Sequence, residues 1–183
     1  MHLRDSLRRI LSSRPPRRLP VVSTTAAAVL VPLFERDGQP HLWLMRRPTS
    51  MRSHAGQVAF PGGKLDASDV SLRAAALRET QEELGIGPER VDVLGALDDT
   101  RTFTGFTISP WVGWLASDID VTPNPNEVAR AFAVPLRAFL APPRGAPPLR
   151  GWTIDGELVW GATAAIVRRL VAVVREVGAE SLT

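Results

Sequence analysis

The chain has 183 residues, 44% of them hydrophobic and 22% charged, a balance typical of one globular domain with a sizeable core. It has no cysteine, which excludes disulfides and thiolate metal sites, so a metal would need oxygen or imidazole ligands. The net charge of +3 is too small to indicate a nucleic-acid partner by itself, although Lys64 is the only lysine and the other strong bases are all arginine.

The first 20 residues form a basic N-terminal arm that is poor in acids. We favour a short surface helix over residues 3–11 followed by a proline-rich stretch, although organelle transit peptides have a similar composition. The apolar run 21–34 is too short to cross a bilayer, and two arginines interrupt the run 164–174. We therefore expect a soluble, cytoplasmic protein with no membrane partner.

The first half of the chain alternates β-prone runs with turn signals. Strands are predicted over 24–34 and 41–45, joined by a hairpin around Asp37-Gly38. A short strand is predicted over 58–60, and we expect Pro61-Gly62-Gly63 to stop it. Residues 71–84 are rich in strong helix formers, with Asp69 or Ser71 as the N-cap and Gly85 as the stop signal.

The second half adds more strands and a closing helix. The predicted strands cover 91–97, 108–115 and 127–134; residues 141–148 form a proline-rich loop; a hairpin covers 152–160 and an amphipathic helix covers 161–177. Strands at both ends, with helices between and after them, favour a mixed sheet covered by helices in an α/β (α+β) fold. We predict one domain over residues 1–183.

The predicted helix over 71–84 ends in three acids, Glu79, Glu82 and Glu83. Their spacing places them on one side of the helix, where like charges repel and where the C-terminal end of the helix dipole disfavours negative charge. A solvated acidic face is one explanation. A divalent cation is the better one, because it converts mutual repulsion into shared coordination, and carboxylate oxygens suit Mg²⁺ or Mn²⁺.

Gly62 and Gly63 precede this helix. Glycine permits positive φ and a close approach of the backbone to a ligand, although such a pair is most often only a turn. Beside an oxygen-rich helix, it indicates a loop whose carbonyls join the cation shell.

The segment 63–86 resembles the Nudix box, G-x5-E-x7-R-E-U-x-E-E-x-G-U, in which U is aliphatic. The first half has Gly63, but its acid is Asp69, and one extra residue separates this acid from the arginine. The longer, aspartate-containing form is similar to the coenzyme A pyrophosphatase subgroup. In the second half, Thr80 departs from the pattern, because it stands at a U position. The other positions match: Arg78, Glu79, Glu82, Glu83, Gly85 and Ile86.

Residues 43–63, "WLMRRPTSMRSHAGQVAFPGG", resemble the upstream motif of that subgroup, L-L-T-x-R-(S/A)-x3-R-x3-G-x3-F-P-G-G. Trp43, Met45 and Pro48 depart from it. Two arginines beside a cation site indicate phosphate clamps, with a basic surface loop as the alternative. Including later stretches, the resemblance covers about residues 21–169. The positions that match the motif are Arg47, Arg52, Gly56, Phe60, Pro61, Gly62 and Gly63.

The resemblance implies a Nudix-type α/β/α sandwich with a catalytic loop-helix-loop. It also implies metal-dependent hydrolysis of the pyrophosphate of coenzyme A or an acyl-CoA, giving 3′-phosphoadenosine 5′-phosphate and a 4′-phosphopantetheine. By this resemblance Glu79 and Glu83 bind Mg²⁺ or Mn²⁺, Glu82 belongs to the same cluster, and Arg78 orients the acids. The general base would be Glu83 or Glu127. The residues expected to bind substrate are Arg47, Arg52, Gly62, Gly63 and Lys64.

Other functions remain open at this point. The box is shared by Nudix enzymes that act on ADP-ribose, dinucleotides or oxidised nucleotides. A basic nucleic-acid-binding module is disfavoured because tyrosine is absent and few aromatics could stack on bases. An inactive scaffold is disfavoured because all three box glutamates are present. A homodimer is possible, and Phe103, Phe106 and Trp111 are candidates for lining a groove for the pantetheine arm.

Overall fold

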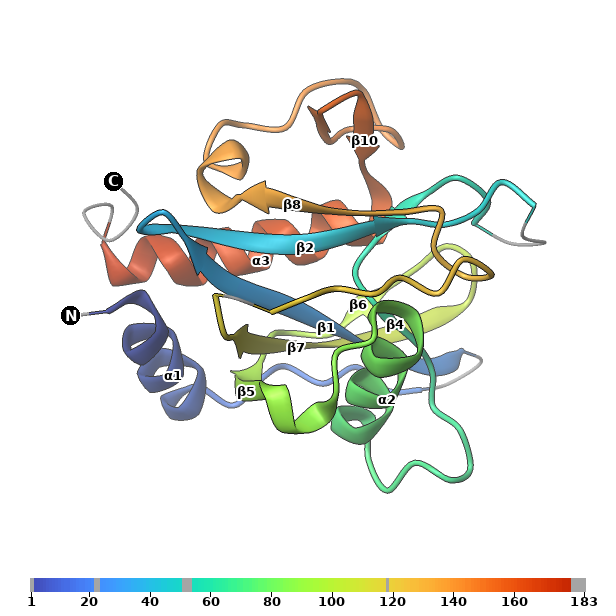
Figure 1. Ribbon diagram of the computed structural model, residues 1–183, viewed down its shortest axis with the longest axis horizontal. Helices are drawn as coiled ribbons and strands as arrows, with labels where there is room; N and C mark the ends of the chain where they lie inside the picture. The colour runs from blue at the N-terminus through green and yellow to red at the C-terminus, as the bar shows by residue number, and fades with distance from the viewer. Residues whose placement is uncertain (1, 22–23, 51–53, 118, 179–183) are drawn as a thin grey trace.

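The computed structural model describes residues 2–21, 24–50, 54–117 and 119–178, and Figure 1 traces their course. The helices are α1 (Leu3–Ser13), α2 (Leu72–Leu84) and α3 (Gly161–Val177), with 3-10 turns η1 (Pro88–Arg90) and η2 (Leu136–Phe139). The strands are β1 (Thr25–Arg36), β2 (Gln39–Arg46), β3 (Val58–Ala59), β4 (Gly62–Lys64), β5 (Val91–Ala96), β6 (Thr100–Arg101), β7 (Phe106–Leu115), β8 (Arg130–Pro135), β9 (Trp152–Ile154) and β10 (Glu157–Val159).

The centre of the fold is an eight-stranded mixed sheet with the main order β3-β2-β1-β7-β5. β1 and β7 are parallel, and the other pairs in this sheet are antiparallel. β4 pairs with β1, β6 with β7, and β8 with β2, while β9 and β10 form a separate hairpin. The mixed sheet predicted from the order of elements is therefore confirmed.

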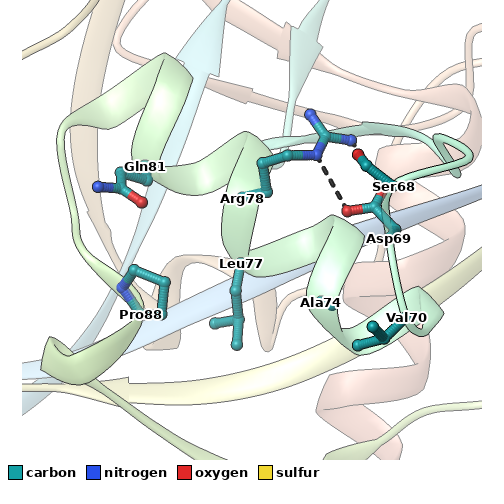
Figure 2. A pocket seen from close by; sticks show the side chains of 8 residues that line it. All are labelled: Ser68, Asp69, Val70, Ala74, Leu77, Arg78, Gln81 and Pro88. Atoms are coloured by element: carbon teal, nitrogen blue, oxygen red, sulfur yellow. Dashed lines mark hydrogen bonds and ion pairs between the residues drawn. The ribbon is translucent and has the colours of Figure 1, made fainter.

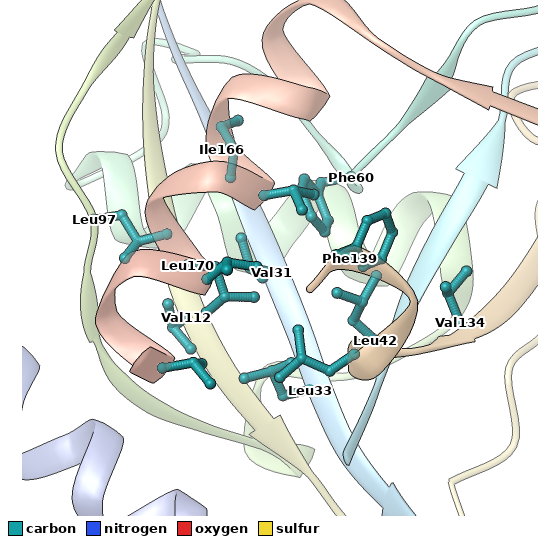
Figure 3. Packing of buried hydrophobic residues seen from close by; sticks show 14 of the residues in the cluster. Val31, Leu33, Leu42, Phe60, Leu97, Val112, Val134, Phe139, Ile166 and Leu170 are labelled. Carbon is teal, nitrogen blue, oxygen red and sulfur yellow. The ribbon is translucent and has the colours of Figure 1, made fainter. Parts of the chain in front are cut away.

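Helices cover both faces of this sheet. Alternate residues of β1 point to opposite sides: Val31 and Leu33 pack in one cluster with α1 and α3, whereas Leu30 and Phe34 pack in another with the C-terminal part of α2. Figure 3 shows the first cluster, in which Ile166 and Leu170 of α3 lie over the sheet. This arrangement is the predicted α/β/α sandwich.

The predicted local elements are largely confirmed. The N-terminal helix runs two residues beyond the predicted 3–11, and the final helix covers the predicted 161–177. Asp37-Gly38 and Asp155-Gly156 both have positive φ at the two central positions, as tight hairpin turns require. No helix within the described ranges is both long and apolar enough to cross a membrane.

Two local predictions were wrong. The short strand ends at Ala59, before Pro61, as predicted, but Gly62 and Gly63 are not a turn or loop, because with the next residue they form β4, which pairs with Ala27–Val29 of β1. Glu127 does not begin a strand, because it lies in a turn and β8 starts only at Arg130. Both differences place backbone next to the end of α2.

The sheet divides on one side of β1. β2 pairs with residues 33–36 of β1, whereas β4 pairs with residues 27–29, so two different strands occupy the same side in succession. Figure 1 shows β1 and β2 separating toward the N-terminal end of β1. The C-terminal end of β2 pairs with β3 and β8 instead. The end of β2 and the outer edge of β4 thus both border the region that α2 faces.

Candidate active site

Helix α2 carries most of the acidic residues, and local sequence sets both of its ends. The Ser71 hydroxyl accepts a hydrogen bond from the Ala74 N–H, so Ser71 is the N-cap. Gly85 ends the helix in the left-handed region at φ 70°. The predicted helix and both of these signals are confirmed.

The loop before β8 docks on the end of α2. The last carbonyls of a helix lack partners within it. Here the Asn124 N–H donates to the Glu83 carbonyl and the Thr122 N–H donates to the Leu84 carbonyl, each at 2.9 Å. The turn continues with the Glu127 N–H donating to the Asn124 carbonyl at 3.0 Å. Two helix-end carbonyls therefore anchor the loop and bring Glu127 to the helix.

Three carboxylates meet at this junction. Glu79, Glu83 and Glu127 each offer an oxygen atom, and these atoms all lie within 4.8 Å of one another. Glu83 is buried, and the other two are half-buried. The group differs from the three box acids, because its third member is Glu127 and not Glu82. On a helix, Glu79 and Glu83 are nearly superposed, whereas Glu82 is turned away from Glu83 by about 100°.

Glu83 lies between the two separated parts of the sheet. Its Oε2 accepts a hydrogen bond from the Gly62 N–H of β4 at 2.8 Å, and Arg47 Nη1 lies 3.4 Å from its Oε1. Its side chain is only 1% exposed. Burial raises its pKa to about 8, with Glu79 and Glu127 adding to the rise, while Gly62 and Arg47 oppose it. The negative charge here is therefore only partly compensated.

Arg78 ties the acidic residues together. Its Nε and Nη2 donate to the two oxygens of Asp69, each at 3.0 Å, and its Nη1 donates to Glu79 at 3.0 Å and Glu82 at 2.9 Å. The Asp69 bonds are the main reason that the pKa of Arg78 rises and that of Asp69 falls. Asp69 thus serves as the bidentate partner of the arginine. Glu82 is half-exposed at the edge of the cluster.

Gly63 allows Glu79 to reach its position. A Cβ at Gly63 would lie 2.3 Å from Oε1 and 2.4 Å from Cδ of Glu79, so only glycine leaves room for this carboxylate. Burial is also the main cause of the raised pKa of Glu79, to which Glu82 and Glu127 contribute. Gly63 therefore acts through its lack of a side chain, which leaves room for Glu79, and Gly62 acts through its backbone N–H. Both residues lie within β4.

The remaining predicted residues lie in different settings. Arg47 is 20% exposed, and among the described residues its Nε is buried without a hydrogen-bond partner and its carboxylate contact is the long one to Glu83. The ammonium of Lys64 lies 5.8 Å from the centre of the Phe106 ring, and Lys64 contributes its carbonyl to Arg78 at 3.4 Å. Arg52 lies outside the described residues.

The three aromatic candidates for an arm-binding groove separate in space. Phe103 is fully exposed at the tip of the β6–β7 loop. Phe106 is half-buried under Lys64 and also contacts the ring of His54. Trp111 packs against the α2 side of the sheet, with Arg18 over its ring at 5.4 Å. Phe103 is therefore open to solvent, Phe106 is covered by Lys64, and Trp111 is partly buried against the sheet, so the three do not form one groove.

A surface hollow of about 280 Å³ lies on the other side of α2 (Figure 2). Asp69 and Arg78 border it and face each other across their ion pair. Helical periodicity places its wall, made by Ala74, Leu77 and Gln81, away from Glu79 and Glu83. This hollow is therefore separate from the carboxylate group.

The residues fit a divalent cation. The donor set consists of carboxylate oxygens, as Mg²⁺ and Mn²⁺ prefer, and the buried negative charge exceeds what Arg47 and Arg78 supply. From the sequence, Glu127 was a candidate general base and not a metal ligand, and neither Asn124 nor Thr122 stood out. The run "NPNE" is typical of a tight turn and could have predicted this one, in which the Asn124 side chain accepts a hydrogen bond from the Asn126 N–H.

Comparison with known proteins identifies the fold family. A model described as the NUDIX domain matches residues 24–155. The chain belongs to the Nudix family. A relative named "Uncharacterized Nudix hydrolase NudL" from Enterobacter sp. (strain 638) is 42% identical over 178 residues, covering 92% of each chain. A relative of the same name from Cronobacter sakazakii is 42% identical over 173 residues, covering 89% of this chain and 90% of that one.

Solved Nudix structures share the fold. The Nudix hydrolase RenU from M. smegmatis superposes with a TM-score of 0.63 at 19% identity, covering 84% of this chain and 87% of that one. The C. elegans Ap4A hydrolase in a binary complex gives 0.61 at 18% identity, covering 84% and 99%. These likenesses show the Nudix fold. The protein is a Nudix hydrolase, a family that generally uses divalent metal ions.

Proposed function

We propose that this Nudix hydrolase cleaves the pyrophosphate bond of coenzyme A or an acyl-CoA with Mg²⁺ or Mn²⁺ bound at Glu79, Glu83 and Glu127. The observation that carries the proposal is Arg47. The upstream motif singles it out, and its guanidinium sits 3.4 Å from the buried carboxylate of Glu83, with one nitrogen that has no hydrogen-bond partner among the described residues. An arginine so placed is ready to pair with a phosphate bound at the metal.

The cation, when bound, neutralises charge on the phosphoryl groups and lowers the pKa of a bound water. The side chains of this protein supply position and proton transfer. Glu83 is held by Gly62, Glu79 fills the space above Gly63, and Arg78 fixes Glu79 from its other side. Glu82 adds negative charge at the solvent edge of the cluster. Lys64 and the Gly62-Gly63 backbone border the position proposed for the diphosphate.

Glu127 is the better candidate for the general base. Both oxygens of Glu83 already face donors, Gly62 and Arg47. Glu127 is half-buried, and the hydrogen bond that its side chain receives within the described ranges is a neutral amide one, from Asn124 Nδ2 to its Oε1 at 3.2 Å. It can therefore accept a proton from an attacking water at lower cost than a carboxylate held on both oxygens. Glu83 remains the alternative base.

The pantetheine arm would leave the site along β4. Gly62 and Gly63 contact the carboxylates, Lys64 follows them and lies over Phe106, and Phe103 is fully exposed beyond. Phe103 would be available there to contact an apolar part of the arm. This arrangement favours a substrate with a long arm over one that ends at a second ribose. We place the reaction in the cytoplasm.

A substrate panel tests the function. CoA, acetyl-CoA, dephospho-CoA, ADP-ribose, NAD, Ap4A and an oxidised nucleoside triphosphate are compared in Mg²⁺ and in Mn²⁺, with products separated by chromatography. We expect CoA or acetyl-CoA to have the highest kcat/KM and to give 3′-phosphoadenosine 5′-phosphate, with ¹⁸O from water in one product phosphate. A tenfold preference for ADP-ribose or the oxidised nucleotide would reject the CoA assignment and retain a Nudix pyrophosphatase.

A further inference from the structure

Two arginines face each other across neighbouring strands beside the candidate active site. Arg46 of β2 and Arg130 of β8 are direct cross-strand partners. Like charges in this position destabilise a sheet. Their side chains are 41% and 43% exposed, so each retains a guanidinium surface open to solvent. A repulsive pair kept at such a place indicates an anion that both arginines can share.

The counter-charge within the described residues is insufficient and loosely held. Glu157 at the start of β10 lies 3.7 Å from Arg46 Nη1 and 3.3 Å from Arg130 Nη1, and it is 13% exposed. One carboxylate therefore serves two guanidinium groups, neither at an ideal ion-pair distance. The Nε of Arg46 is buried and has no hydrogen-bond partner in the part of the chain that the structure describes. The trio keeps a net charge of about +1 and unused donor capacity.

Backbone connections place this pair next to the carboxylates. Arg46 directly precedes Arg47, and Arg130 follows Glu127 by three residues. The Ala129 N–H donates to the Arg46 carbonyl at 2.9 Å and joins the two segments. Alternation along the strands sends Arg46 and Arg130 to the α3 side of the sheet, where Leu44 and Phe132 pack, whereas Arg47 points to the α2 side.

β2 ends at Arg46, so a ligand lying across the end of this strand can contact groups on both sides of the sheet. The scissile diphosphate would lie with Arg47 and the carboxylates on the α2 side. The nucleoside attached to it would then cross the strand end toward Arg46 and Arg130. An additional phosphate on its ribose would be a dianion one sugar away from the reacting bond.

We propose that Arg46 and Arg130 form a second anion subsite that binds a phosphomonoester on the nucleoside half of the substrate. Arginine suits this role because its planar fork pairs with phosphate oxygens in a bidentate manner. Glu157 orients both guanidinium groups in the free protein and competes with the incoming phosphate. The inference rests on the proposed function, in which the substrate is CoA and the phosphomonoester is its 3′-phosphate.

The test compares substrates that differ only in that phosphate. Arg46→Gln, Arg130→Gln and Glu157→Gln are assayed with CoA and dephospho-CoA, and Arg36→Gln serves as a control that removes the same charge at the far end of β1. Each of the first two variants should lower the CoA to dephospho-CoA ratio of kcat/KM roughly tenfold, as loss of one charged hydrogen bond predicts. Glu157→Gln should raise the ratio, and Arg36→Gln should leave it unchanged.

A binding measurement tests the anion subsite independently of whether the enzyme cleaves CoA. Calorimetric titration compares 3′-phosphoadenosine 5′-phosphate with 5′-AMP. The former should bind wild type roughly tenfold more tightly, and Arg46→Gln should remove the difference. That result without CoA cleavage would retain the subsite and reject the CoA function. CoA cleavage with a kcat/KM ratio that neither arginine variant changes would overturn the subsite and retain the function.

Discussion

Substitution of Gly63 separates the folding role of the glycine pair from its role at the carboxylates. A Cβ at this position would overlap Glu79, 2.3 Å from Oε1 and 2.7 Å from Oε2. Gly63 is absent from the residues with positive φ, so alanine meets no backbone barrier there. The obstacle is the far end of a flexible side chain. We therefore expect Gly63→Ala to move the carboxylate of Glu79 and leave the strand in place.

The expected energies differ for the fold and the cation. Alanine restricts the unfolded chain by about 0.4–1 kcal/mol, which offsets part of the cost of moving Glu79. The free energy of unfolding without metal should change by less than about 1 kcal/mol. Misplacing a ligand should weaken metal binding roughly 10–100-fold, the range found when supporting contacts of metal ligands are lost. The apparent Mg²⁺ requirement for turnover should rise by the same factor.

Gly62→Ala is the matched control. Gly62 has φ 153°, and a Cβ there would lie 2.3 Å from the Ala28 carbonyl and 2.6 Å from Val29 Cα, which are backbone atoms of β1. A backbone cannot yield as a side chain can, so this variant should lose about 2 kcal/mol or more of stability. The two variants thus differ by one position and should fail differently.

The assay is thermal unfolding without metal, followed by Mn²⁺ titration calorimetry and activity as a function of Mg²⁺. Gly63→Ala should add little to Glu79→Gln, because both act through the same carboxylate. Unchanged metal affinity in Gly63→Ala would refute the proposal that Glu79 binds the cation from this position. A large loss of stability would refute the assignment of the clash to a movable side chain.

Further substitutions test the acids one at a time. Glu83→Gln should reduce turnover in saturating Mg²⁺ by several orders of magnitude, and near-normal turnover would reject Glu83 as a ligand. Burial raises the pKa of Glu83 from 4.5 to about 8. Because the unfolded chain then loses this proton at lower pH than the folded protein, the free energy of unfolding without metal should fall as pH rises between these values. Unfolding measurements should show a smaller fall in Glu83→Gln. Glu82→Gln should cost at least tenfold less activity than Glu83→Gln, because Glu82 is half-exposed and its side chain bonds to Arg78 at the edge of the cluster. Glu127→Gln should lower kcat at saturating metal more than it weakens metal binding, and the reverse result would make it only a ligand.

Local signals determined the secondary structure of this protein. These signals act within a few residues: the hydroxyl of Ser71, the left-handed conformation of Gly85 and the Asp-Gly turns at 37–38 and 155–156. The sequence alone therefore predicted the helix and the hairpins whose ends they mark. The acidic end of α2 was also predictable, because a charge pattern that opposes helix stability needs an external cation to explain it. The spacing of the Nudix-box residues indicated the family.

Only the tertiary structure decided which acids meet. Glu127 joins Glu79 and Glu83 because the loop before β8 satisfies the last carbonyls of α2, a contact between segments about 40 residues apart in sequence. Gly62 and Gly63 became a strand because β1 has an open edge where β2 turns away. The pairing of Arg46 with Arg130 follows from the register of β2 and β8. Periodicity shows which face a side chain takes, whereas its partner across the sheet depends on long-range register that no local signal encodes.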